Sequence, residues 1–169
     1  MIRKGYGQVE PNHLSAQRTG QIYAQLPANK DIKQLENGQF VKYDYAEGEV
    51  NLSGKGEYML VFNEIKLYDG MRETYKDFVM AAKDAVEGEI VPRLFKTNIG
   101  DIFTTNCFEK AATSRDAETE MTDLAAGDVL GINEDGFLEK DAESDIQFQV
   151  AKVYTLADGQ AAAKIQRIA

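Results

Sequence analysis

The sequence predicts a mainly β fold, either a small antiparallel β-barrel or a β-sandwich. Short runs of apolar and β-branched residues recur from residue 21 onwards at intervals of about 8–12 residues, which is typical of these architectures. Gly-Asp, Asn-Gly and Asp-Gly pairs separate the runs and mark tight turns. Helical spacing is confined to one segment, residues 72–86. A chain of 169 residues is long enough to bury such a core in one domain.

The first 20 residues differ from the rest of the chain. They contain three glycines, one proline and isolated hydrophobic residues, with neither strand nor helix periodicity. We therefore expect an extended N-terminal arm over residues 1–20, followed by a β-rich domain over residues 21–169. A subdivision of this domain near residues 88–90 is left open.

Two strands are predicted before residue 70. Residues 39–45 follow the Asn37-Gly38 turn signal and place Val41, Tyr43 and Tyr45 on one face. Residues 58–68 are the strongest strand candidate, apolar on both faces at the start and on one face at the end. That pattern predicts a strand that is buried on both sides where it begins.

Residues 72–86 can be interpreted as one short helix. Their large apolar side chains recur at spacings of three and four, and Gly88 is well placed to end a helix. Residues 75–80 taken alone also fit a strand, so both alternatives stay open.

After residue 88 the pattern is β throughout. Pro92 interrupts residues 89–95 and favours an edge strand there. Gly-Asp pairs open the runs 102–108 and 129–132, Asn133–Gly136 forms a hairpin turn, a bulge is expected near residues 150–151, and residues 157–160 form the last turn. The acidic, polar residues 111–126 are expected to form a long surface loop.

The residue inventory argues against an enzyme and against a bound cofactor. The chain has one cysteine and one histidine, so it can form neither an internal disulfide nor a zinc site with several cysteines or two histidines. His13 lies in the least patterned segment, where a catalytic base could not be held rigidly. Cys107 lies in an apolar run and is expected to behave as a small hydrophobic residue.

Cation and sugar sites are weaker alternatives. Asn133–Gly136 has only part of a calcium-loop pattern, because positions 131 and 142 lack the required acids. Asp141, Glu143 and Asp145 could hold a weakly bound cation, although solvation of an exposed edge explains them equally simply. Tyr43 and Tyr45, on one strand face near Tyr58, suggest an aromatic platform, but their alternation with charged residues favours core packing.

The formal charge of −9 is unevenly distributed. Residues 109–145 carry 12 acidic and three basic residues, whereas residues 1–35 carry five basic and two acidic ones. This balance disfavours nucleic acid as a direct partner. A basic arm would instead suit an acidic protein neighbour, with Arg3, Lys4 and Arg18 as the candidate contacts. The chain begins without an apolar signal segment and has no apolar run of membrane-spanning length, so we expect synthesis in a cytoplasm and no membrane partner.

Three C-terminal segments carry a resemblance to a known class of proteins. They are PRLFKTNIGDIFTTNCF (residues 92–108), GDVLGINEDGFL (residues 127–138) and FQVAKVYTLADGQAAAKIQRI (residues 148–168). In their Gly-Asp strand openings and Gly-containing hairpins they resemble the decoration, cement or head-auxiliary proteins of tailed bacteriophages. Those proteins are small β-barrels or sandwiches that bind the outside of an assembled capsid. The resemblance covers about residues 90–169 and transfers no functional residues, because the class has no catalytic set.

The resemblance implies a structural virion protein on the capsid surface, made in the host cytoplasm. Its partners would be major capsid protein subunits, and copies of itself in a homo-oligomer. Residues 1–57 and 72–86 exceed the minimal decoration fold, which leaves a head–tail joining or fibre-base role as an alternative. A carbohydrate- or cation-binding β module is the other alternative, and it predicts an exposed aromatic pair beside residues 141–145.

Overall fold

The computed structural model describes residues 1–13, 25–63, 77–109, 113–114 and 117–169. These residues form antiparallel β-sheets, and their only helical elements are two single 3-10 turns, η1 (Ala82–Asp84) and η2 (Val86–Gly88). The prediction of a mainly β, antiparallel protein is therefore confirmed. Within the described part of the chain, no sheet closes into a barrel, and no helix is long and apolar enough to cross a membrane.

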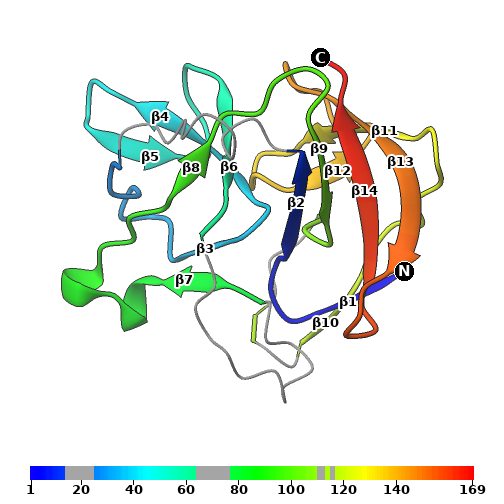
Figure 1. Ribbon diagram of the computed structural model, residues 1–169. Helices are drawn as coiled ribbons and strands as arrows, with labels where there is room; N and C mark the ends of the chain where they lie inside the picture. Colours follow the sequence, from blue (N-terminus) through cyan, green and yellow to red (C-terminus); the bar gives the residue numbers. More distant parts are fainter. Residues whose placement is uncertain (14–24, 64–76, 110–112, 115–116) are drawn as a thin grey trace.

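The largest sheet has six strands in the order β12-β11-β13-β14-β9-β2 and occupies the right-hand half of Figure 1. Its strands are β2 (Val9–His13), β9 (Ile102–Thr105), β11 (Val129–Ile132), β12 (Leu138–Lys140), β13 (Phe148–Thr155) and β14 (Ala161–Arg167). The Gly-Asp pairs at residues 100–101 and 127–128 directly precede β9 and β11, as expected from the sequence.

A four-stranded sheet in the order β5-β4-β6-β8 forms the other main layer. Its strands are β4 (Phe40–Asp44), β5 (Glu49–Asn51), β6 (Tyr58–Val61) and β8 (Leu94–Phe95). Since β8 pairs with β6, this sheet contains strands from both sides of residues 88–90. Strand β8 lies at the edge of the sheet, as the position of Pro92 in the sequence predicted.

Two short pairs complete the fold. Strand β1 (Ile2–Lys4) pairs with β10 (Glu118–Glu120), and β3 (Gln34–Glu36) pairs with β7 (Val79–Ala81). In Figure 1 the first pair lies below the six-stranded sheet and the second lies below the four-stranded sheet.

The four-stranded sheet is buried on both faces. Phe40, Leu60 and Phe95 face the six-stranded sheet, and the ring of Phe40 lies 5.4 Å from that of Phe148 on β13. The opposite face forms a second core with β3 and the chain around Ile90, through Val41, Met59, Val61 and Leu94. Met59, Leu60 and Val61 are all buried, which confirms the expectation of a two-sided strand here. Residues 64–68 lie outside the described residues.

The turn chemistry follows the sequence signals closely. The Asn133 side chain accepts hydrogen bonds from the backbone N–H groups of Asp135 and Phe137, and so closes the β11–β12 hairpin. The register of β13 against β14 shifts between Val150 and Lys152, where the change in side-chain parity predicted a bulge. Local signals were sufficient for both features because each is made by contiguous residues.

The structure corrects two of the predicted elements. Residues 77–86 form β7 and 3-10 turns rather than an α-helix, whereas residues 72–76 lie outside the described residues. Pairing with β3 supplies the backbone hydrogen bonds, and Met80 packs against the second core, so tertiary contacts override the helical spacing. The predicted loop over residues 111–126 contains β10, whose polar sequence gave no strand signal.

The predicted N-terminal arm is wrong for residues 1–13. These residues form β1 and β2, and β2 extends the six-stranded sheet beside β9. Polar residues with little periodicity are compatible with such strands because backbone pairing and buried hydrogen bonds hold them in place. Residues 14–20, including Arg18, lie outside the described residues.

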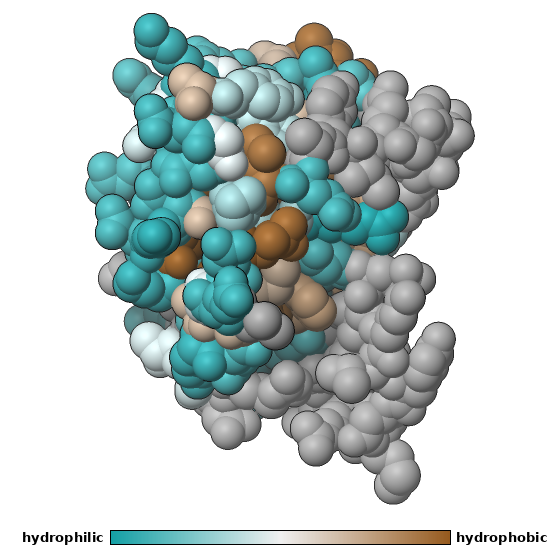
Figure 2. All heavy atoms as spheres, turned by 90° about the vertical axis from the view of Figure 1, so that its left-hand side faces the viewer, coloured by the Kyte–Doolittle hydropathy of each residue, from teal (hydrophilic) through white to brown (hydrophobic). Residues whose placement is uncertain are grey.

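One face of the surface is shown in Figure 2. Hydrophilic residues predominate there, and hydrophobic residues appear as small, separate patches among them. A broad apolar docking surface is therefore not seen among the described residues on this face.

Candidate functional site

Arg3, a predicted partner contact, lies in the interior. Its guanidinium forms a bidentate ion pair with Glu36, with N–O distances of 3.3 and 3.4 Å, and both side chains are completely buried. Glu36 also accepts the backbone N–H of Gly7. Arg3 therefore joins β1 to the end of β3 and is not available to a partner at the surface.

Gly7 makes this arrangement sterically feasible. A Cβ atom at this position would lie 2.0 Å from the carbonyl oxygen of Asn37, so the two backbone segments could not approach as they do. The next residue, Gln8, extends the polar cluster: its backbone N–H donates to Asn106 at 2.7 Å, and its side-chain amide donates to Asp77 at 2.5 Å. These contacts connect residues far apart in the sequence.

The final hairpin completes this buried network. Asp158 accepts hydrogen bonds from the side-chain amides of Gln8 and Gln160, at 2.7 and 2.9 Å. The side-chain carbonyl of Gln160 in turn accepts hydrogen bonds from the side-chain amide of Asn106 and from the backbone N–H of Lys4. Since these polar groups bind one another, the network explains how the N-terminal segment is held and needs no ligand.

Lys4 and Arg18 complete the set of predicted contacts. Lys4 is 53% exposed and pairs with Glu118 at 3.2 Å, so it lies at the surface beside β10. Arg18 lies outside the described residues. The structure thus places Arg3 and Lys4 on opposite sides of one strand, one inside and one outside.

Of the two residues considered for catalysis, the structure describes the backbone of His13 and the whole of Cys107. His13 belongs by its backbone to β2, pairing with Ile102, rather than to an unstructured segment. Cys107 is a free thiol that is completely buried. Burial, together with the nearby Glu36 carboxylate, raises the pKa of the Cys107 thiol well above its ordinary value. A thiol in this state is a poor nucleophile at neutral pH.

This burial gives a direct test of the packing. Native protein is expected not to react with Ellman's reagent at pH 8, because Cys107 is inaccessible and protonated. In 6 M guanidinium chloride one thiol per chain should react rapidly. Stoichiometric labelling of the native protein within minutes would contradict the burial.

The acidic residues between positions 109 and 145 were considered for a cation site. Among the described residues, no three or more His, Cys, Asp or Glu side chains are grouped so as to hold a metal ion. Asp128 instead pairs with Lys140 at 3.1 Å. Burial of the ring, together with the charge of Asp145, raises the pKa of the Tyr58 phenol.

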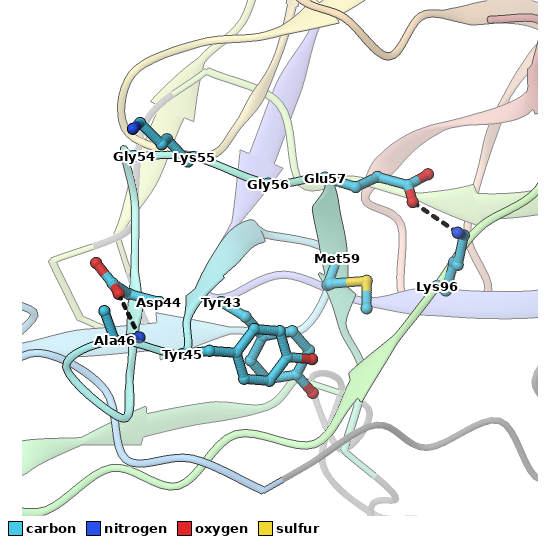
Figure 3. Close-up of a pocket in the computed structure, with 10 residues that line it drawn as sticks. All are labelled: Tyr43, Asp44, Tyr45, Ala46, Gly54, Lys55, Gly56, Glu57, Met59 and Lys96. Atoms are coloured by element: carbon cyan, nitrogen blue, oxygen red, sulfur yellow. Dashed lines mark hydrogen bonds and ion pairs between the residues drawn. The ribbon is translucent and has the colours of Figure 1, made fainter.

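A surface pocket of about 740 Å³ lies at the outer end of β4 and β6 (Figure 3). Tyr43 and Tyr45 stack on its wall, with ring centroids 5.3 Å apart and planes inclined by 23°. Tyr43 is buried, as the core interpretation predicted, but Tyr45 is 68% exposed. The pocket is lined by Tyr43, Asp44, Tyr45, Ala46, Gly54, Lys55, Gly56, Glu57, Met59 and Lys96.

Charged side chains stand at the edge of this pocket. Glu57 pairs with Lys96 at 2.8 Å and with Arg167 at 2.9 Å, so it links β6 to the segment after β8 and to β14. Burial raises the pKa of the Glu57 carboxyl, but hydrogen bonds and charges from Lys96 and Arg167 outweigh it and hold the pKa below its ordinary value. The carboxylate is therefore ionised at neutral pH.

The lowered pKa of Glu57 predicts a pH-dependent effect on stability. A carboxyl with a depressed folded-state pKa stabilises the fold above its unfolded pKa, here near 4.5, and loses this contribution as the pH falls through the folded value. We expect Glu57→Gln to lower the free energy of unfolding at pH 7 by up to about 1 kcal/mol, since the pair is partly exposed. The difference from wild type should shrink below pH 4. Urea unfolding at pH 7 and pH 3.5 checks this, and an equal difference at both values would contradict it.

Comparisons with protein-family models, with curated proteins and with solved structures found no match for this chain. The tyrosine pocket is thus defined by its geometry alone. The sequence signals that could have located it are the pair Tyr43/Tyr45 and the glycines on either side of Lys55. Their proximity depends on how the loop after β5 folds back towards β4.

Proposed function

We propose that the chain is a structural protein of a tailed-bacteriophage head that binds the outside of the assembled capsid and stabilises contacts between capsid subunits. The observation that supports it most is the origin of the six-stranded sheet. Its four inner strands, β11, β13, β14 and β9, all come from the three segments that resemble decoration proteins. Segments separated in sequence thus combine into one antiparallel unit, which supports treating them as parts of one resemblance.

Residues 1–13 are paired in strands β1 and β2, so they cannot reach a capsid as a free arm. The capsid-binding surface therefore has to lie elsewhere on the molecule. Ile99 and Ile168 are 72% and 39% exposed and lie at the same end of the molecule, because Gly100 donates a backbone hydrogen bond to Arg167 at 2.9 Å. An apolar side chain that is exposed in the free chain gains free energy when a partner buries it. We assign this end of β9 and β14 to the contact with capsid subunits.

Co-sedimentation with assembled shells tests the proposal. The shells are assembled from the major capsid protein of the virions under test. We expect saturable binding at a fixed ratio, and at least tenfold weaker binding for the double variant Ile99→Asp/Ile168→Asp. Tyr45→Asp, at another exposed site, is the matched control and should bind as wild type does. Sedimentation no greater than that of an unrelated protein would overturn the function, and an unaffected double variant would overturn the assigned surface.

A further inference from the structure

We propose that the tyrosine pocket binds a carbohydrate, with a pyranose ring stacked on Tyr45. None of the residues that line this pocket is one of the two isoleucines assigned to the capsid contact, so the site would add recognition of a glycan to the proposed structural role. It rests on the stacked rings, the flanking charged groups and the open glycine loop shown in Figure 3.

The aromatic pair forms a fixed platform. Tyr43 is held in the second core, and its ring supports Tyr45 from behind at a centroid distance of 5.3 Å. In Figure 3 the two hydroxyl groups point in the same direction, towards the side of the pocket that carries Met59 and Lys96. A supported and exposed aromatic face is complementary to the C–H groups on one face of a pyranose.

A carboxylate suited to sugar hydroxyls stands at the edge of the pocket. Glu57 is ionised, and beside its pairs with Lys96 and Arg167 its oxygens have further lone pairs that can accept hydrogen bonds from hydroxyls. Lys55 is exposed on the glycine loop, and in Figure 3 its ammonium group points away from the stacked rings, so it would contact only the outer part of a ligand. An apolar surface with a few polar groups at its edge is the usual composition of a small-molecule site.

The loop after β5 keeps the pocket open. Gly54 and Gly56 have φ angles of 122° and 115°, which side-chain-bearing residues rarely adopt, and they flank Lys55. The two glycines add no side chain to the pocket, so their backbone groups remain accessible on its edge. At about 740 Å³ the pocket falls within the usual range of ligand sites and can accommodate more than one sugar ring.

The geometry disfavours a proline-rich peptide, which is the main competing ligand for exposed tyrosines. Such peptides dock in grooves between aromatic side chains. Here the two rings are stacked on each other at 23°, so they form one platform and leave no slot between them. A single-stranded nucleic acid would also stack, but the net charge of −9 opposes phosphate binding.

A glycan array followed by NMR titration tests the site. The fluorescently labelled isolated chain is applied to an array of bacterial, plant and animal saccharides, and the ¹⁵N-labelled chain is titrated with the strongest binder. We expect amide shifts concentrated at residues 43–46 and 54–57. Tyr45→Ala should weaken binding at least tenfold, whereas Tyr45→Phe, which keeps the ring, should weaken it less than threefold. Val91→Ala, at an exposed apolar position outside both proposed surfaces, is the control and should leave the affinity unchanged.

Three results would overturn the proposal. They are an array without binding above background, shifts that fall outside residues 43–46 and 54–57, and unchanged affinity in a Tyr45→Ala variant with wild-type thermal stability. A proline-rich peptide that shifts the same residues while no saccharide binds would assign the pocket to a peptide. Because these measurements use the isolated chain, their failure would leave the capsid-binding proposal unaffected.

Discussion

Replacing Arg3 with Ala is expected to lower the free energy of unfolding by about 3–5 kcal/mol, because it leaves the Glu36 carboxylate buried without its cation. The same change would remove the connection between β1 and β3. Chemical denaturation followed by circular dichroism measures the effect. Glu36→Gln should also destabilise the fold strongly, because it leaves the Arg3 guanidinium, which cannot lose its proton, buried without its counter-charge.

Lys4 provides the matched control one residue away. Both side chains of its ion pair with Glu118 are exposed, so Lys4→Ala should lower the free energy of unfolding by less than about 1 kcal/mol. If both alanine variants were as stable as wild type, residues 1–13 would be an arm, as the sequence first indicated, and the buried pair would not exist in solution.

The second large effect is expected at Phe148 on β13. Its ring lies 5.4 Å from Phe40 and 5.7 Å from Phe103, so it connects the facing layers of the main core. Phe148→Ala should destabilise the fold by about 3–5 kcal/mol through lost apolar burial and the cavity it leaves.

Thermal and urea unfolding of Phe148→Ala and Phe148→Leu measure this contribution. The leucine variant keeps part of the buried volume and should lose clearly less stability than the alanine variant. A substitution at an exposed position, such as Ile99→Ala, should leave the free energy of unfolding within about 0.5 kcal/mol of the wild-type value. A loss below 1 kcal/mol for Phe148→Ala would mean that the two sheets are not joined through this ring.

The strands and turns of the C-terminal half could be predicted because their signals are local. Gly-Asp pairs, the Asn133–Gly136 turn and the parity change near Val150 each act within a few residues, and the structure contains all of them. For residues 72–86 the sequence left a helix and a strand open, because spacing alone cannot tell a helix from a strand that meets a partner, and the described part contains the strand β7. The partner, β3, lies about 40 residues away.

The N-terminal segment and the pocket depended on long-range contacts that the sequence does not reveal. Arg3 resembles any basic residue near a terminus, and only the fold brings Glu36 and Gly7 to it. Tyr45 has the same strand parity as Tyr43, but β4 ends at Asp44, so the second ring leaves the core. Cys107 was correctly expected to be buried, whereas its polar neighbours, Arg3 and Glu36, come from β1 and β3 and could not be foreseen.

Cryo-electron microscopy of virions, purified on a gradient from a lysate in which this chain is produced, tests the proposed capsid role most directly. We predict density that fits the paired four- and six-stranded sheets on the outer surface of the shell, repeated at equivalent sites, with the end carrying Ile99 and Ile168 towards the capsid subunits. Density confined to the portal vertex would instead assign a joining or fibre-base role. Virions that lack the chain altogether would contradict the proposed function.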